Sequence, residues 1–310
     1  MKEIENLILI ISKFSPSKLP LLNQGTVDSN NLESRLYQNI KAGKYKEEKD
    51  AIIDLYGKSE DYYKYQMLKS RLRQKLSNHL HFVQDKTGAS KVSEKKCFDL
   101  IHQAKALLHL TEYPLAEEQF NKALKTALQY EFTDIIIDCL SNLNFIYTQL
   151  RDGTKFYKTL KLLKEYKALK IKEDEAYEIY YTNKIEFSKS ILFHKKVLQK
   201  LPSFVEQVKK LWQGTNSYNI FYYYYMLSGL YHEFTGDFLA SIEDNKKWLK
   251  LFRGEKINTK RFDPLLANFL IIYSLFRAKK FKQGLVLAPK YLREFNPFSR
   301  NWFAYMLHYF

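Results

Sequence analysis

The stretch TEYPLAEEQFNKALKTA, residues 111–127, decides the fold class of this chain. Ala116, Phe120 and Ala123 follow one another at spacings of four and three residues, which place them on one face of an α-helix. The alanines allow a neighbouring backbone to approach closely, and Phe120 fills space that a uniformly small interface would leave empty. A second apolar stripe precedes it and consists of Leu100, Ala104, Leu107 and Leu108. Because the link at 111–113 is short, we expect the two helices to lie antiparallel.

The same helix-turn-helix arrangement returns three times, at about 143–169, 227–252 and 268–292. The small position of the second helix falls at Ala116, Thr159, Ser241 and Gly284. These positions fit a period of about 42 residues if a further unit lies between 170 and 215, where we expect Pro202 to start a helix. Self-similarity at such a period indicates stacked helical repeats, although a non-repeating all-α bundle stays open as the alternative.

The pattern resembles the tetratricopeptide repeat, in which a Gly-Asp-Tyr turn is followed by alternating small and aromatic positions. Tyr113, Ala116 and Phe120 match that pattern, whereas Asn245 and Trp248 depart from it in the copy at 236–249. The resemblance covers about residues 97–296, with repeats longer than the usual ~34 residues. It implies a right-handed α-solenoid of antiparallel helix pairs that binds a protein or peptide in its concave groove.

The first ninety residues predict an N-terminal helical subdomain, followed by repeats over 91–310 that end in a C-terminal helix at 298–310. Within the subdomain we expect a loop at 15–31, which is rich in Pro, Ser, Asn and Gly. The helices around it are expected at about 1–14, 31–41, 46–56 and 59–83. The apolar C-terminal helix could pack on the last repeat or on a second copy of the chain.

Composition favours long helices and a reducing compartment. The 310 residues include only 10 Gly and 7 Pro, which is few turns for a β fold of this size, and 45% are hydrophobic. The two cysteines, Cys97 and Cys139, form no CxxC pair. No apolar stretch approaches the ~18–20 residues of a membrane span, and the N-terminus does not read as a secretory signal. These features predict a soluble, cytoplasmic, all-α protein.

Positive charge is concentrated near the C-terminus. The formal net charge is +16, and residues 246–310 contain 14 basic and only 3 acidic side chains. An acidic partner would suit this end of the chain through Arg277, Lys279, Lys280, Lys282 and Arg293. Lys outnumbers Arg 41 to 9, which weakens a nucleic-acid interpretation, because phosphate and base recognition favours the Arg fork.

A nucleic-acid-associated regulator remains the alternative function, with DNA contacts from the helices at 31–83 and with the repeats as a sensor or dimerisation region. Lys64, Arg71 and Lys75 share a flank of the third of these helices. Acidic residues nearby, among them Glu47, Glu48 and Asp50, would repel phosphate.

Motifs that carry catalysis or bind cofactors are missing from the sequence. It contains no HExxH, phosphate loop, GxGxxG or GxSxG. We therefore expect no enzyme activity, cofactor or metal, and predict a binding scaffold or adaptor. Asn183, Asn219 and Tyr222 are the candidate groove contacts, since they fall on the expected inner helices and the run Tyr222–Tyr225 covers every helical face.

Overall fold

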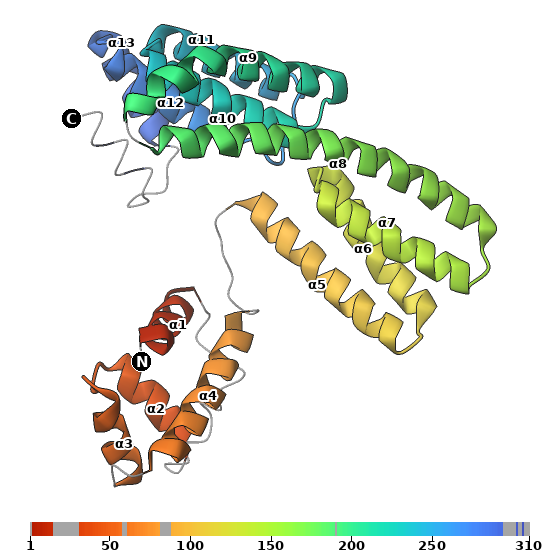
Figure 1. Cartoon of the computed structure of the whole chain (residues 1–310), viewed down its shortest axis with the longest axis vertical. Coiled ribbons are helices and arrows are strands. Elements are labelled where there is room, and N and C mark those ends of the chain that lie inside the picture. Colours follow the sequence, from red (N-terminus) through yellow and green to blue (C-terminus); the bar gives the residue numbers. More distant parts are fainter. Residues whose placement is uncertain are drawn as a thin grey trace. The chain divides into compact units, whose positions relative to one another are not determined.

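The computed structural model describes residues 2–14, 31–57, 61–80, 88–189 and 191–293, together with Trp302 and Met306. Thirteen α-helices account for the regular structure of these residues, which contain no β-strand (Figure 1). The predicted all-α class is confirmed. Contacts divide the chain between Gly88 and Ala89 into two compact units, close to the boundary expected at residue 90.

The first unit has four helices around its own core. They are α1 (Lys2–Phe14), α2 (Leu32–Lys41), α3 (Glu48–Tyr56) and α4 (Tyr62–His79). Ile4, Ile8 and Ile11 form one buried face of α1, at spacings of four and three residues, and pack with the buried leucines of α2 and α4. Tyr65 of α4 is fully buried in the same core. The subdomain is therefore built from amphipathic helices, as its sequence predicts.

The second unit consists of nine helices, α5 to α13. They are α5 (Ala89–His109), α6 (Tyr113–Tyr130), α7 (Thr133–Gln149), α8 (Gly153–Phe187), α9 (Ile191–Thr215), α10 (Tyr218–Thr235), α11 (Phe238–Arg253), α12 (Pro264–Arg277) and α13 (Phe281–Leu292). Consecutive helices pack on one another throughout. Ala116, Phe120, Ala123 and Ala127 have no exposed surface, so the face predicted from 111–127 is the buried face of α6. Four inter-helix turns fall where the copies predict them.

The sequence predicts a separate helical repeat between 170 and 215, and the structure differs in where the helices of this region begin and end. Helix α8 continues for 35 residues, well past the predicted end of the preceding copy near residue 169. Its second half has no glycine or proline to stop it, and Lys170 and Asp174 form a stabilising i, i+4 pair at 3.0 Å. Pro202 lies inside α9 and does not start a helix.

Helix α8 belongs to two cores, which Figure 1 shows as two groups of helices along the long green helix. The first core contains residues of α5, α6 and α7, with Leu163 from the first half of α8. The second contains residues of α9 to α13, with Ala176, Tyr180 and Phe187 from the second half. The first half of α8 thus pairs with α7, and its second half pairs with α9.

Two predicted segments fall mainly outside the described residues. Of the loop at 15–31, only Asn31 is described, and its side chain caps α2 by accepting hydrogen bonds from the backbone N–H groups of Glu33 and Ser34. Of the C-terminal helix at 298–310, only Trp302 and Met306 are described; both are helical, and Trp302 packs against the second core.

Candidate functional site

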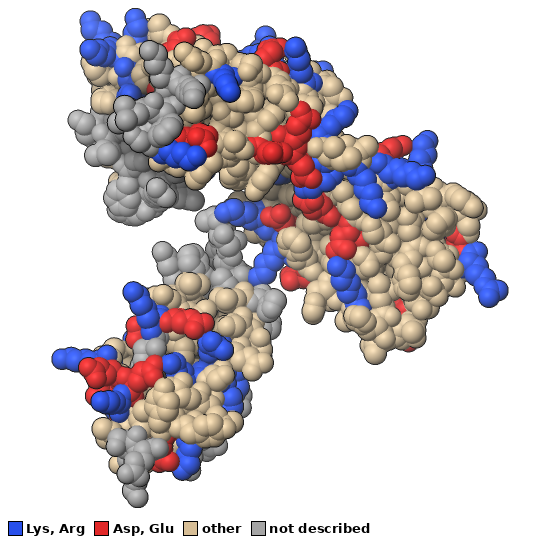
Figure 2. All heavy atoms as spheres, in the orientation of Figure 1, with Lys and Arg blue, Asp and Glu red and all other residues tan. Residues whose placement is uncertain are grey.

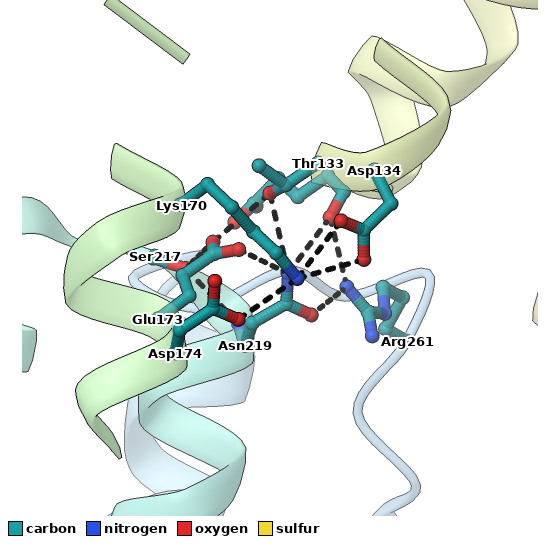
Figure 3. A network of polar contacts seen from close by, with 9 residues as sticks. Thr133, Asp134, Lys170, Glu173, Asp174, Ser217, Asn219 and Arg261 are labelled. Atoms are coloured by element: carbon teal, nitrogen blue, oxygen red, sulfur yellow. Dashed lines mark hydrogen bonds and ion pairs between the residues drawn. The ribbon is translucent and has the colours of Figure 1, made fainter. Parts of the chain in front are cut away.

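A buried carboxylate joins three helices where the two cores of the second unit meet. Glu173, on α8, is only 3% exposed and accepts hydrogen bonds from Thr133 Oγ1 at 2.9 Å, Ser217 Oγ at 2.5 Å and Asn219 Nδ2 at 3.0 Å (Figure 3). Thr133 starts α7, and Asn219 lies in the first turn of α10. A buried carboxylate needs such partners, so these three donors fix the ends of α7 and α10 against the middle of α8.

The loop between α11 and α12 extends this network. Arg261 Nη1 donates to Asn219 Oδ1 at 2.7 Å and to the Glu131 carbonyl at 3.0 Å. Its guanidinium lies over the rings of Tyr218, at 4.5 Å, and Phe132, at 5.3 Å. We call the set Thr133, Glu173, Ser217, Asn219 and Arg261, with Glu131, the polar junction.

Glu131 ties the junction to the α6–α7 turn. Its carboxylate accepts from the Tyr218 backbone N–H at 2.7 Å and from Asn258 Nδ2 at 2.8 Å. Lys260 adds a bond of 2.8 Å to Gln129 Oε1. These contacts join residues up to 131 positions apart in sequence. The polar junction therefore holds the two helix groups together from outside the apolar cores.

An exposed cluster of tyrosines lies on α8 and α10, which pack side by side. Tyr177, Tyr181 and Tyr222 are 50%, 43% and 39% exposed, and Tyr223 connects them. The Tyr223 ring centroid is 5.8 Å from Tyr177, 6.2 Å from Tyr181 and 5.6 Å from Tyr222. We call these four residues the tyrosine surface. Exposed aromatic clusters of this kind are typical of protein-binding surfaces.

One lysine stands beside the tyrosine surface. Lys184 Nζ lies 5.6 Å from the ring centroid of Tyr180 and 5.8 Å from that of Tyr181. Among the described residues it has no carboxylate partner. The surface thus combines apolar and aromatic area, phenol hydroxyls and one positive charge.

The three predicted groove residues fall in three different places. Tyr222 belongs to the tyrosine surface, and Asn219 belongs to the polar junction. Asn183 is a correction: it is only 4% exposed and donates to the Ile179 carbonyl of its own helix at 2.7 Å, so its amide does not face a groove. Within the run 222–225, Tyr224 and Tyr225 are core residues.

The sequence analysis missed the other members of both sites. Tyr177 and Tyr181 are spaced i, i+4 in YEIYY, a signal that could have placed both on one helical face. Glu173 and Arg261 gave no comparable signal, because their partners lie 40 or more residues away.

The predicted C-terminal cations are exposed at the end of the second unit. Lys279, Lys280, Lys282 and Arg293 have no carboxylate partner among the described residues, and blue side chains surround α13 in Figure 2. Arg277 differs, because its Nη1 pairs with Glu233 Oε1 at 2.9 Å and its guanidinium covers the Phe238 ring at 4.6 Å. Arg277 is therefore already engaged within the fold.

The basic flank proposed for DNA contacts is neutralised within the first unit. Lys64 pairs with Asp61 at 2.9 Å, and both Arg71 and Lys75 pair with Glu33, which is largely buried. A phosphate would have to displace these carboxylates before it could use the three cations. No observation on this flank favours nucleic acid over its internal ion pairs.

Other reactive groups gather into no site in the part of the chain that the structure describes. It holds no cluster of three or more His, Cys, Asp or Glu side chains that could bind a metal ion, and none of its helices has the length and apolarity to cross a bilayer. Burial raises the pKa of the Cys97 thiol to about 11 and that of Cys139 to about 12, so both remain protonated at neutral pH.

Comparisons with known proteins add no relative. No family model matches the chain, and neither the curated proteins nor the solved structures gave a match.

Proposed function

We propose that this protein is a non-enzymatic scaffold that binds a segment of a partner protein on the tyrosine surface of α8 and α10. The observation that carries the proposal is the exposure of Tyr177, Tyr181 and Tyr222 together on two packed helices. Tyrosine offers a large contact area with few rotatable bonds and a hydroxyl for hydrogen bonding. Burying such rings under a peptide releases water from apolar surface.

The proposal includes the fold-level interpretation that residues 89–292 form a right-handed, tetratricopeptide-like solenoid. Its support is the packing of consecutive helices and the small-aromatic-small face of α6, all of whose members are buried. The long α8 is the departure from that pattern. In this interpretation α8 and α10 supply inner surface, since both carry exposed tyrosines on the side where they pack together.

The partner segment is proposed to be acidic. Lys184 beside the tyrosine surface and the exposed cations Lys279, Lys280, Lys282 and Arg293 leave uncompensated positive charge on this unit. A carboxylate near Lys184 would gain a charge-assisted hydrogen bond, while apolar side chains of the same segment would cover the tyrosine rings.

A pull-down from nuclease-treated native lysate tests the proposal. The bait is the full chain, compared with a triple variant, Tyr177→Ser/Tyr181→Ser/Tyr222→Ser. Tyr157→Ser is the matched control, because Tyr157 is 71% exposed on the first half of α8, outside the tyrosine surface. We expect one protein to be recovered with the wild type and the control, to be lost with the triple variant, and to cross-link to the Lys184 amine.

Equal recovery by the triple variant, with helicity unchanged, would rule out the tyrosine surface as the contact. A partner that is lost on nuclease treatment would instead support the nucleic-acid alternative. In that case the charge-reversed first-unit variant Lys64→Glu/Arg71→Glu/Lys75→Glu becomes the decisive comparison.

A further inference from the structure

Helix α13 packs against α12 through one of its faces. Ala288 on this face is buried, and Leu287 and Tyr291 pack against the second core. A Cβ added at Gly284 would lie 3.9 Å from the Leu275 Cβ of α12. The spacings of three and four residues among these positions place them on one side of the helix, so the opposite side of α13 does not face α12.

The opposite side of α13 combines exposed cations with exposed apolar side chains. Its exposed residues are Lys282, Leu285, Val286, Pro289, Lys290 and Arg293. They recur at spacings of three and four residues, as one helical face requires, and together with the turn at 276–281 we call them the α13 face. Leu285 is 54% and Val286 76% exposed, and within the turn Phe276 and Phe281 are exposed side by side, with ring centroids 5.9 Å apart.

The positive charge of the α13 face is not balanced by neighbouring carboxylates. Residues 264–293, which span α12 and α13, contain six basic and no acidic side chains. Arg277 pairs with Glu233 of α10. The other five cations form no ion pair in the part of the chain that the structure describes; they are Lys279, Lys280, Lys282, Lys290 and Arg293.

We propose that the α13 face binds the surface of an anionic lipid bilayer. The cations lie among the lipid phosphates, and Phe281, Leu285 and Val286 enter the shallow apolar layer beneath the headgroups. Lysine suits this position, because its apolar stem can be buried while its ammonium group stays at the level of the phosphates. The proposal does not depend on peptide binding by the tyrosine surface, which lies on α8 and α10.

The mixture of charge and apolar area favours a bilayer over other anionic partners. Protein interfaces gather apolar side chains in a core that is depleted of charged residues, whereas Lys282 lies within about one helical turn of both Leu285 and Val286. A nucleic acid would use the cations but would give these two side chains no apolar environment. Four of the five free cations are lysines, which act as point charges and lack the paired donors with which Arg binds a single phosphate.

Flotation of the full chain with lipid vesicles tests the proposal. The vesicles contain phosphatidylcholine alone, or phosphatidylcholine with about one third phosphatidylglycerol as the anionic lipid. We expect the protein to float with the anionic vesicles only. High salt should release it, since the Debye length falls from about 8 Å at physiological ionic strength to about 3 Å at 1 M. No flotation with anionic vesicles, or equal flotation with both compositions, would overturn the proposal.

Two variants test whether the α13 face is the contact. Leu285→Gln/Val286→Gln changes only exposed apolar side chains and keeps every charge, so we expect a folded protein that binds anionic vesicles about tenfold more weakly. Lys279→Gln/Lys280→Gln/Lys282→Gln removes three exposed charges and should weaken binding about a hundredfold.

Each variant has a matched control elsewhere in the second unit. Leu115→Gln/Ile171→Gln changes two exposed apolar side chains, and Lys158→Gln/Lys161→Gln/Lys164→Gln removes three exposed charges of α8. Both controls should bind anionic vesicles as the wild type does. Unchanged binding by either variant of the α13 face would overturn the proposal. Retardation of a DNA duplex through the same three lysines, without flotation, would assign the face to nucleic acid instead.

Discussion

Asp54 shows how one carboxylate organises the first unit. Its side chain accepts from Lys44 Nζ at 2.7 Å, from the Tyr45 hydroxyl at 2.6 Å and from Asn39 Nδ2 at 2.9 Å. Arg35 adds an ion pair at 3.3 Å. The Lys44 ammonium and then the Tyr45 hydroxyl lower the pKa of Asp54 to about 2 from an ordinary value of 3.8. This residue therefore ties α2, the following turn and α3 together only while it is ionised.

We predict that Asp54→Asn reduces the free energy of unfolding of the first unit by about 1.5–3 kcal/mol at neutral pH, since several charge-assisted bonds are lost. The folded pKa of Asp54 lies below its unfolded value, so its contribution is complete above about pH 4 and disappears as the pH falls through about 2. Hydrogen exchange of residues 32–56, measured against pH, checks both statements. Glu3→Gln, which removes an exposed carboxylate 3.7 Å from Arg73, is the control. A wild-type advantage that persisted at pH 2 would contradict this assignment.

Two residues with the same backbone conformation have opposite roles. Glu131 and Arg151 both end a helix with left-handed φ angles, of 53° and 54°. Such angles strain residues that have a Cβ, and glycine relieves the strain. Arg151 has no side-chain partner among the described residues, whereas the Glu131 carboxylate bonds Tyr218 and Asn258 across the polar junction.

We therefore predict opposite signs for the same substitution. Arg151→Gly should raise the free energy of unfolding of the second unit by about 0.5–1 kcal/mol. Glu131→Gly should lower it by about 1–3 kcal/mol, because the loss of two partly buried, charge-assisted hydrogen bonds outweighs the relief of strain. Urea denaturation followed by circular dichroism measures both. Stabilisation by Glu131→Gly would show that the polar junction contributes little.

At the scale of the element, α8 explains both a success and a failure of the sequence analysis. Helix stripes such as that of α6 were predictable, because the residues that bury them lie one short turn away. The continuity of α8 was not predictable, because its apolar positions pack in the first core up to Tyr166 and in the second from Ala176 onward. Because the two halves of α8 pack in different cores, its buried residues do not keep one helical spacing from end to end, and no single apolar stripe marks the helix in the sequence.

We predict that the continuity of α8 couples the opening of the two cores. Ala168 is exposed between them, so Ala168→Pro breaks the helix at a cost of about 3 kcal/mol or more without touching either core. Hydrogen exchange should then report different opening free energies for residues 97–147 and 218–275, whereas we expect equal values in the wild type. Ala168→Gly, at about 1 kcal/mol, should show a smaller separation. Equal loss of protection in both cores would leave the polar junction as the coupling element.

At the scale of the whole molecule, the described residues form three cores in two units, and α8 is shared by the two cores of the second unit. Composition, sparse Gly and Pro, and short turns were enough to predict an all-α chain. The polar junction could not be predicted from the sequence, since Arg261 and Glu131 lie 130 positions apart and no motif connects them. Of the tyrosine surface, the sequence analysis predicted Tyr222 as a contact residue but did not predict Tyr177 or Tyr181.

The distribution of cysteine and tryptophan gives each of the two cores of the second unit its own chemical or spectroscopic reporter. Both thiols are buried in the first core, whereas the rings of Trp212 and Trp248 meet edge to face in the second. Residues 1–88 contain neither residue type and leave both signals undisturbed. Alkylation of the native cysteines therefore times the opening of one core, and indole emission follows the other, in the same unlabelled sample.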